Sequence, residues 1–220
     1  MKKRKMDGAI FDLDGTLLDS MSVWDNIAER YLKRLGKIPQ STLREDLRPL
    51  DLYDSAVFLY KTYSLTRTPE QIIKDINDEL HDFYQYKAPL KEGVLEFLEH
   101  LKHTGKKLAI ATATSRPLVD MALERTGIAA YFDYIVTCPD VKCSKEKPDI
   151  YLNALQTIGT DIRTTPVFED ALFAIQTAKA AGFPVVGVYE KTADPQREDI
   201  KIYSDIYVQK INDCLAYFEL

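Results

Sequence analysis

The sequence predicts an α/β fold: a parallel sheet with helices on both faces and a small all-helical insert after its first strand. Three observations lead to this prediction. From residue 89 onward, short apolar runs alternate with helical stripes that end at glycines. Residues 19–87 show helical patterns alone, and one apolar run precedes them. Such alternation is typical of a sheet covered on both sides, a Rossmann-like arrangement.

The short apolar runs are the expected strands of this sheet. They lie at residues 9–11, 108–111, 134–137, 167–168, 185–189 and 206–208. Helices are expected between them at residues 94–101, 116–125, 149–158 and 171–181, each followed by a glycine. Glycine commonly ends a helix because it adopts the left-handed conformation without strain. A last helix is expected to run to the C-terminus.

The insert is predicted to consist of helices. Ser20 can cap the first of them, which has apolar residues at helical spacing and ends at Gly36. A second helix is expected at residues 54–63. Thr68 and Gln71 have the spacing of a capping box at the start of a third helix, with a proline in its first turn. We therefore predict a helical cap at residues 19–87 and an α/β core made of residues 1–18 and 88–220.

Two carboxylates follow the first predicted strand. Asp12 and Asp14 are separated by one residue, so in extended chain both side chains point to the same side. Gly15 allows the backbone to turn away close to them. Converging carboxylates repel each other unless a proton or a cation lies between them. Because all the ligands offered are oxygens, the pattern predicts a site for Mg²⁺.

Polar residues also follow two later strands. Thr112 comes directly after the run 108–111, and Glu169 and Asp170 follow the run 167–168. Each of these residues alone fits a helix cap as well as a binding site. However, ligands of open parallel sheets bind at the carboxyl ends of the strands. The joint placement therefore predicts one cavity lined by all of them.

The string Asp12-Leu13-Asp14-Gly15-Thr16-Leu17-Leu18-Asp19-Ser20 resembles the first motif of the haloacid dehalogenase superfamily, in its phosphatase and phosphomutase branch. Thr112 is similar to the hydroxyl residue of the second motif. Lys145, three residues before Pro148-Asp149, is similar to the lysine of the third, whereas Lys147 is expected to be a surface charge. The pair Glu169-Asp170 resembles the acidic fourth motif. All four motifs occur in the order of the superfamily.

This resemblance implies an enzyme that forms an aspartyl-phosphate. Asp12 would be the nucleophile, ionised at neutral pH, and Asp14 the general acid and base. Lys145 and the Thr112 hydroxyl would stabilise the phosphoryl oxygens. The implied catalytic residues are Asp12, Asp14, Thr112 and Lys145, the phosphate-binding residues are Asp12, Gly15, Thr16, Thr112, Ala113 and Lys145, and the ligands of Mg²⁺ are Asp12, the backbone carbonyl of Asp14, Glu169 and Asp170.

The leading functional prediction is Mg²⁺-dependent hydrolysis of a small phosphorylated metabolite. A phosphosugar mutase of the same branch is the first alternative, but those enzymes place a histidine where Trp24 stands here. A dehalogenase would need neither Asp14 nor Mg²⁺. The third alternative is a phospho-ligand-binding protein with weak or no turnover. Its only support is Ala171, which replaces a serine common in relatives, since a lost supporting hydroxyl costs roughly 10–100-fold, and the retained Asp12, Asp14 and Lys145 oppose it. Ala174, a few residues on, replaces a frequent glycine.

Composition excludes several other classes. The net charge of -5 gives no general attraction to nucleic acid. No apolar run approaches the ~20 residues of a membrane span, and no apolar segment of a signal peptide follows the basic start at residues 1–6. The three cysteines lack a CxxC spacing, which favours reduced thiols. We predict a cytoplasmic protein without nucleic-acid or membrane partners.

Other charged residues are expected at the surface. Residues 2–5 are predicted to form a solvated tail, because four basic residues are few for a nucleic-acid arm. Arg44, Arg48 and Arg67 of the predicted cap could contact a second anionic group, but a surface position is the better interpretation of each. The oligomeric state and the cap residues that contact substrate stay open.

Overall fold

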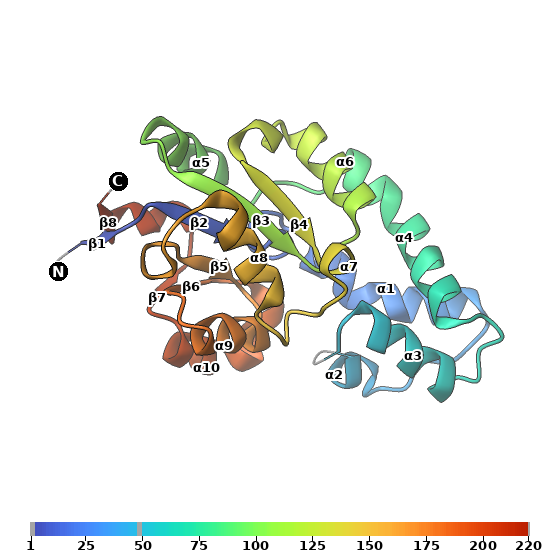
Figure 1. Ribbon diagram of the computed structural model, residues 1–220. Coiled ribbons are helices and arrows are strands. Elements are labelled where there is room, and N and C mark those ends of the chain that lie inside the picture. The colour runs from blue at the N-terminus through green and yellow to red at the C-terminus, as the bar shows by residue number, and fades with distance from the viewer. Residues whose placement is uncertain (1–2, 48–49, 220) are drawn as a thin grey trace.

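The computed structural model describes residues 3–47 and 50–219 and has a parallel sheet at its centre (Figure 1). The sheet has six strands in the order β4-β3-β2-β5-β6-β7. These strands are β2 (Gly8–Phe11), β3 (Lys107–Thr112), β4 (Tyr134–Thr137), β5 (Val167–Glu169), β6 (Val185–Val188) and β7 (Ile206–Val208). Every neighbouring pair is parallel. Strand β2, which precedes Asp12, therefore lies between β3, which ends at Thr112, and β5, which ends at Glu169.

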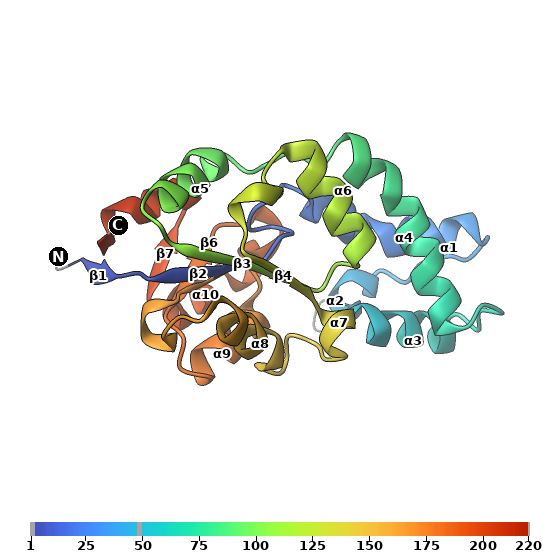
Figure 2. The same ribbon diagram turned by 45° about the horizontal axis from the view of Figure 1, so that its top comes forward.

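Helices cover both faces of the sheet, as Figure 2 shows. On one face lie α5 (Val94–His103) and α6 (Arg116–Thr126), and on the other lie α8 (Asp149–Ile158), α9 (Leu172–Ala180) and α10 (Arg197–Tyr203). Successive strand residues point to opposite faces. Thus Phe11 contacts Phe97 of α5, whereas Ile10 belongs to the apolar cluster that includes Ile150 and Ile175 of α8 and α9. The predicted fold class is confirmed.

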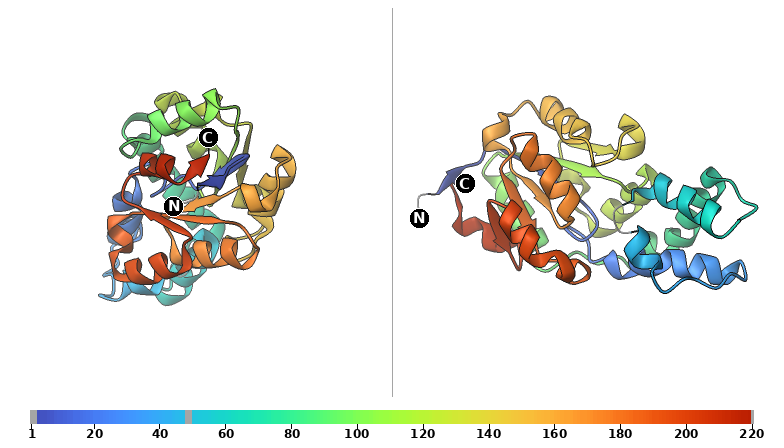
Figure 3. Two further views of the ribbon diagram at one scale, coloured as in Figure 1. Left: turned by 90° about the vertical axis from the view of Figure 1, so that its left-hand side faces the viewer. Right: turned by 90° about the horizontal axis from the view of Figure 1, so that it is seen from below.

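Residues 19–87 contain helices and no strand among those that the structure describes. They are α1 (Met21–Arg34), α2 (Leu43–Leu47), α3 (Leu52–Thr62) and α4 (Pro69–Tyr86). The capping box predicted for α4 is present, with the Gln71 N–H on the Thr68 hydroxyl and the Thr68 N–H on the Gln71 side chain. These helices lie beyond the carboxyl ends of the strands (Figure 3, right). The two connections to the core run side by side, joined by the bridge between Leu18 and Leu90.

The chain ends differ from the prediction. Instead of a last α-helix, the 3-10 helix η4 (Ile211–Ala216) is followed by β8 (Phe218–Glu219), which pairs in parallel with β1 (Arg4–Lys5). The Phe218 side chain of β8 is buried. The expected solvated tail is wrong for the backbone of residues 4–5, although both side chains are exposed, and its residue 2 lies outside the described residues.

Shorter helices lie in the connections of the α/β part of the chain. They are α7 (Cys138–Val141), η1 (Ala129–Tyr131), η2 (Ile162–Thr164) and η3 (Lys191–Gln196). Within residues 3–47 and 50–219, we find no helix with both the length and the apolar character needed to cross a membrane.

Candidate active site

Side chains from the ends of neighbouring strands meet at one edge of the sheet. Asp12 follows β2, and Glu169 and Asp170 stand at the end of the adjacent β5. One carboxylate oxygen from each of these three residues lies within 4.8 Å of the others, and all three residues are buried. Parallel strands bring about this meeting because their carboxyl ends share one edge.

Lys145 reaches this acidic group from the loop between α7 and α8. Its Nζ donates to Asp12 Oδ1 and, at 2.6 Å, to Glu169 Oε1. The hydroxyl of Tyr151 donates to the same Glu169 oxygen at 2.9 Å. The Lys145 side chain is only 5% exposed, so its charge is directed at the carboxylates and away from solvent. Lys147, two residues on, is exposed as expected.

The buried charges change the acidity of this site. Burial, together with the Glu169 and Asp14 carboxylates, raises the pKa of Asp12 to about 8 against the lowering effect of Lys145. Burial, Asp12 and Glu169 raise the pKa of Asp170 well above its usual range. Although burial alone would lower it, the Asp12 and Glu169 carboxylates raise the pKa of Lys145. Burial is the largest cause of the shift in the pKa of Asp12, so the metal-free site favours the protonated carboxyl more than solvent would.

The free energy of unfolding of the metal-free protein is expected to fall as pH rises from about 4 to about 8. In this range Asp12 has lost its proton in the unfolded chain, where its pKa is 3.8, but keeps it in the folded chain, where the pKa is about 8. Folding then takes up a proton, so each rise in pH favours the unfolded state until the folded pKa is passed. Urea denaturation in EDTA across this range should show a shallower fall for Asp12→Asn. Equal slopes for the two proteins would contradict the shift.

A divalent cation fits this group of residues. The donors are all carboxylate oxygens, which hard cations such as Mg²⁺ prefer over softer ligands. Lys145 contacts two of these three carboxylates, Asp12 and Glu169, and burial raises the pKa values of Asp12 and Asp170. A bound cation would supply the missing positive charge and favour the ionised carboxylates. Asp12, Glu169 and Asp170 are the side chains that could hold it.

The Gly15 turn closes this group from the side of β2. Its φ of 85° is in the left-handed region, and a Cβ at this position would collide with the Asp170 carboxylate. Thr16 donates from Oγ1 to Asp170 Oδ1 at 3.3 Å. Lys91, which the sequence did not single out, donates from Nζ to the Gly15 carbonyl at 2.6 Å and to Glu190 at 2.8 Å. The turn is thus fixed from both sides, and glycine is required where it passes Asp170.

Thr112 and Ala113 lie at the end of β3, beside β2. Thr112 is buried, and its Oγ1 accepts a hydrogen bond from the Thr114 N–H at 3.1 Å. The Thr112 hydroxyl proton therefore remains available to a further acceptor.

The Ser115 hydroxyl does not cap α6, although Ser115 stands at its N-cap position.

The Asp14 carboxylate is bound by hydroxyl groups that the sequence analysis missed. Ser20 Oγ donates to Oδ1 at 2.5 Å, Tyr84 donates to the same oxygen, and Thr114 Oγ1 donates to Oδ2 at 2.6 Å. Ser20 stands at the N-cap of α1 but makes no side-chain cap, because its hydroxyl is turned to Asp14. Burial and the Asp14 carboxylate raise the pKa of Tyr84 well above its usual range, so the phenol stays a donor. The Asp14 side chain is not part of the acidic group around Asp12.

Ala171 and Ala174 stand where the resemblance to the superfamily led us to expect serine and glycine. Ala171 is the N-cap of α9 and offers no side-chain oxygen. Its backbone N–H, like that of Asp170, donates to Glu169 Oε2. Together with Lys145 and Tyr151 on the other oxygen, these donors orient Glu169 without a serine hydroxyl. Ala174 is fully buried against the sheet.

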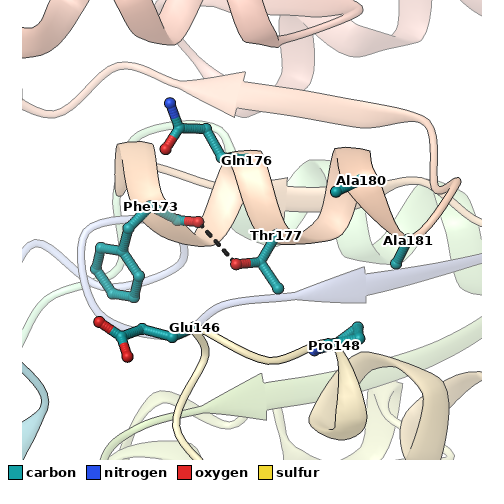
Figure 4. Close-up of a pocket in the computed structure, with 7 residues that line it drawn as sticks. All are labelled: Glu146, Pro148, Phe173, Gln176, Thr177, Ala180 and Ala181. Atoms are coloured by element: carbon teal, nitrogen blue, oxygen red, sulfur yellow. Dashed lines mark hydrogen bonds between the residues drawn. The ribbon is translucent and has the colours of Figure 1, made fainter.

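A separate hollow lies outside this site, between α9 and the loop before α8 (Figure 4). It is lined by Glu146, Pro148, Phe173, Gln176, Thr177, Ala180 and Ala181. None of the predicted site residues lines it, and it adds nothing to the chemistry at the strand ends. The predicted cap arginines are also engaged elsewhere: Arg44 binds Asn26 and Arg67 binds Asp75, while Arg48 lies outside the described residues.

The chain belongs to the haloacid dehalogenase-like hydrolases, since the model of this family matches residues 9–188. A pyrophosphatase PpaX of Bacillus velezensis is 34% identical over 86% of this chain and 85% of its own length. A phosphorylated carbohydrates phosphatase of Thermotoga maritima is 28% identical over 86% of this chain and 88% of its own. The structure of a β-phosphoglucomutase from Clostridium difficile matches with a TM-score of 0.76 at 21% identity, covering 94% of this chain and 92% of that one.

Within that family, the chain falls in the phosphatase and phosphomutase branch, as its four motifs predicted. It is an enzyme of the phosphatase type.

Proposed function

We propose that this phosphatase hydrolyses a small phosphorylated metabolite in a Mg²⁺-dependent reaction, with an aspartyl-phosphate on Asp12 as intermediate. The observation that supports the proposal most is the buried group of Asp12, Glu169 and Asp170 with Lys145 in direct contact. A buried cluster of this composition has no structural need for so many charges, because an apolar core would be as stable. Perturbed ionisable groups in one place are instead typical of active sites.

In the proposed reaction, an Asp12 carboxylate oxygen attacks phosphorus and the bond to the leaving oxygen breaks. Asp14 gives its proton to that oxygen, then accepts a proton from the water that attacks the aspartyl-phosphate. Inorganic phosphate leaves and both aspartates return to their first state. Lys145 and the Thr112 hydroxyl would stabilise the phosphoryl oxygens, and the backbone at Gly15, Thr16 and Ala113 would border them. When bound by Asp12, Glu169, Asp170 and the Asp14 carbonyl, Mg²⁺ supplies positive charge that offsets that of the phosphoryl group.

The substrate belongs to the proposal as well. Pyrophosphate and phosphorylated carbohydrates are the first compounds to test, because the relatives named above include a pyrophosphatase and a phosphatase of such carbohydrates. We also propose that residues 19–87 act as a cap domain over a core of residues 1–18 and 88–220. Their helices lie beyond the strand ends where the acidic group is found (Figure 1). A cap that sheds water would strengthen each electrostatic contact below it. The cytoplasmic location expected from the sequence stays a prediction.

The test is a phosphate-release screen over a panel of phosphorylated metabolites and pyrophosphate, with Mg²⁺ and with EDTA. Turnover that needs Mg²⁺ and is lost in Asp12→Asn would support the proposal. Conversion of a phosphosugar to its isomer without phosphate release would make the chain a mutase instead. Phosphate binding without any turnover would make it a binding protein.

A further inference from the structure

A buried tyrosine connects the helical insert to Asp14. Tyr84, near the end of α4, is fully buried, and its hydroxyl donates to Asp14 Oδ1. The same hydroxyl accepts a hydrogen bond from Trp24 Nε1 of α1 at 2.7 Å. An indole N–H can only donate, so it occupies a lone pair of the phenol oxygen and leaves the phenol proton for Asp14. Trp24 thus orients the Tyr84 hydroxyl, whose proton is directed at the Asp14 carboxylate.

The two oxygens of Asp14 are held from different parts of the chain. Oδ1 is bound by Ser20 and Tyr84, which belong to residues 19–87, and Oδ2 by Thr114, which follows β3 of the sheet. A change in the placement of α4 relative to the sheet would alter the Tyr84 donor on Oδ1 and leave the Thr114 donor on Oδ2. The orientation of the Asp14 carboxylate thus depends on where the insert lies.

We propose that Tyr84, itself oriented by Trp24, is a positioning residue that holds the Asp14 carboxylate for proton transfer and makes this transfer depend on the position of the cap. This inference rests on the proposed function, in which Asp14 protonates the leaving group. Tyr84 touches neither substrate nor the acidic group around Asp12 in this account and acts through Asp14 alone.

The test compares two substrates with Tyr84→Phe. The variant keeps the buried ring and removes only the hydroxyl. An alkyl phosphate needs a proton on its leaving oxygen, whereas p-nitrophenyl phosphate releases a stable anion and needs none. Proton transfer contributes roughly 10²–10⁴-fold to such reactions, and we expect kcat/KM for the alkyl phosphate to fall about tenfold or more. For p-nitrophenyl phosphate, kcat/KM should stay within about twofold, because this ratio reports the steps up to phosphoryl transfer.

Two further variants make the result specific. Trp24→Phe removes the donor to Tyr84. It should also lower kcat/KM for the alkyl phosphate, by a smaller factor than Tyr84→Phe, and leave kcat/KM for p-nitrophenyl phosphate nearly unchanged. Tyr31→Phe is the matched control: Tyr31 is also fully buried in the insert and its hydroxyl also donates to a carboxylate, that of Asp75 at 3.0 Å. In this control, kcat/KM should stay at the wild-type value for both substrates.

The outcomes separate the inference from the function on which it rests. Equal losses for both substrates in Tyr84→Phe, or no loss for either, would overturn the positioning role while Asp12→Asn still abolishes turnover. Wild-type protein without Mg²⁺-dependent turnover of either substrate would overturn the proposed function, and the positioning role with it.

Discussion

Asp12→Asn should lower Mg²⁺-dependent phosphate release on the order of 10⁴-fold or more, because it removes the proposed nucleophile and leaves no oxygen anion in its place. The folded state should persist. Burial raises the pKa of Asp12 to about 8, which favours the uncharged form in the metal-free site, and the amide has nearly the same shape as the carboxyl. Lys145 also keeps its second partner, Glu169. Steady-state phosphate release and thermal unfolding, measured on the same preparation, check both parts of this expectation.

The matched control is Asp78→Asn on the surface of α4, where the aspartate side chain is 64% exposed and paired with Lys74. Losing an exposed ion pair costs about 0–1 kcal/mol, so this variant should keep its activity. Retention of wild-type activity in Asp12→Asn would show that Asp12 is not the nucleophile.

Lys145→Met is expected to have the second largest effect, on activity and stability together. It removes a cation that contacts both Asp12 and Glu169 and is only 5% exposed. Removing one partner of a buried ion pair costs roughly 3–5 kcal/mol, which is about 10 °C in melting temperature for a chain of this size. Phosphate release should fall by about 10²–10³-fold, because a preorganised charge near the phosphoryl oxygens is lost. Thermal unfolding in EDTA and kcat/KM with Mg²⁺ measure the two effects.

Lys147→Met is the control from the same loop. Because Lys147 is exposed, the melting temperature and activity of the Lys147→Met variant should match those of the wild type. If Lys145→Met and Lys147→Met behaved alike, the charge that Lys145 brings to the acidic group would have no functional part.

The central features of the fold could be predicted from local patterns. The apolar run of a strand and the apolar stripe of a helix are each contained in a short segment of sequence. The strands of a parallel sheet are buried on both faces, so each appears in the sequence as a continuous apolar run. The chain end could not be predicted in this way. The spacing of Ile211 and Cys214 suits a 3-10 turn as well as an α-helix, and β8 exists only because β1, more than two hundred residues away, is its partner.

Some residues of the candidate site could likewise be predicted from local patterns, and others could not. Asp12, Glu169 and Asp170 stand at strand ends, so the order of the strands is enough to bring them together. Tyr84 and Lys91 carry no local signal, since each reaches its partner through the packing of the whole molecule. The raised pKa of Asp12 could not be predicted from the sequence for a similar reason. Its raised pKa comes from burial among other carboxylates, which the residue type alone does not reveal.

Acid-quenched mass spectrometry of the enzyme during turnover with Mg²⁺ tests the covalent step most directly. A phosphoryl group should appear on the peptide that contains Asp12, should be released by hydroxylamine as acyl phosphates are, and should be absent from Asp12→Asn. Rapid turnover with the label on another residue, or with no labelled peptide at any quench time, would contradict phosphoryl transfer to Asp12.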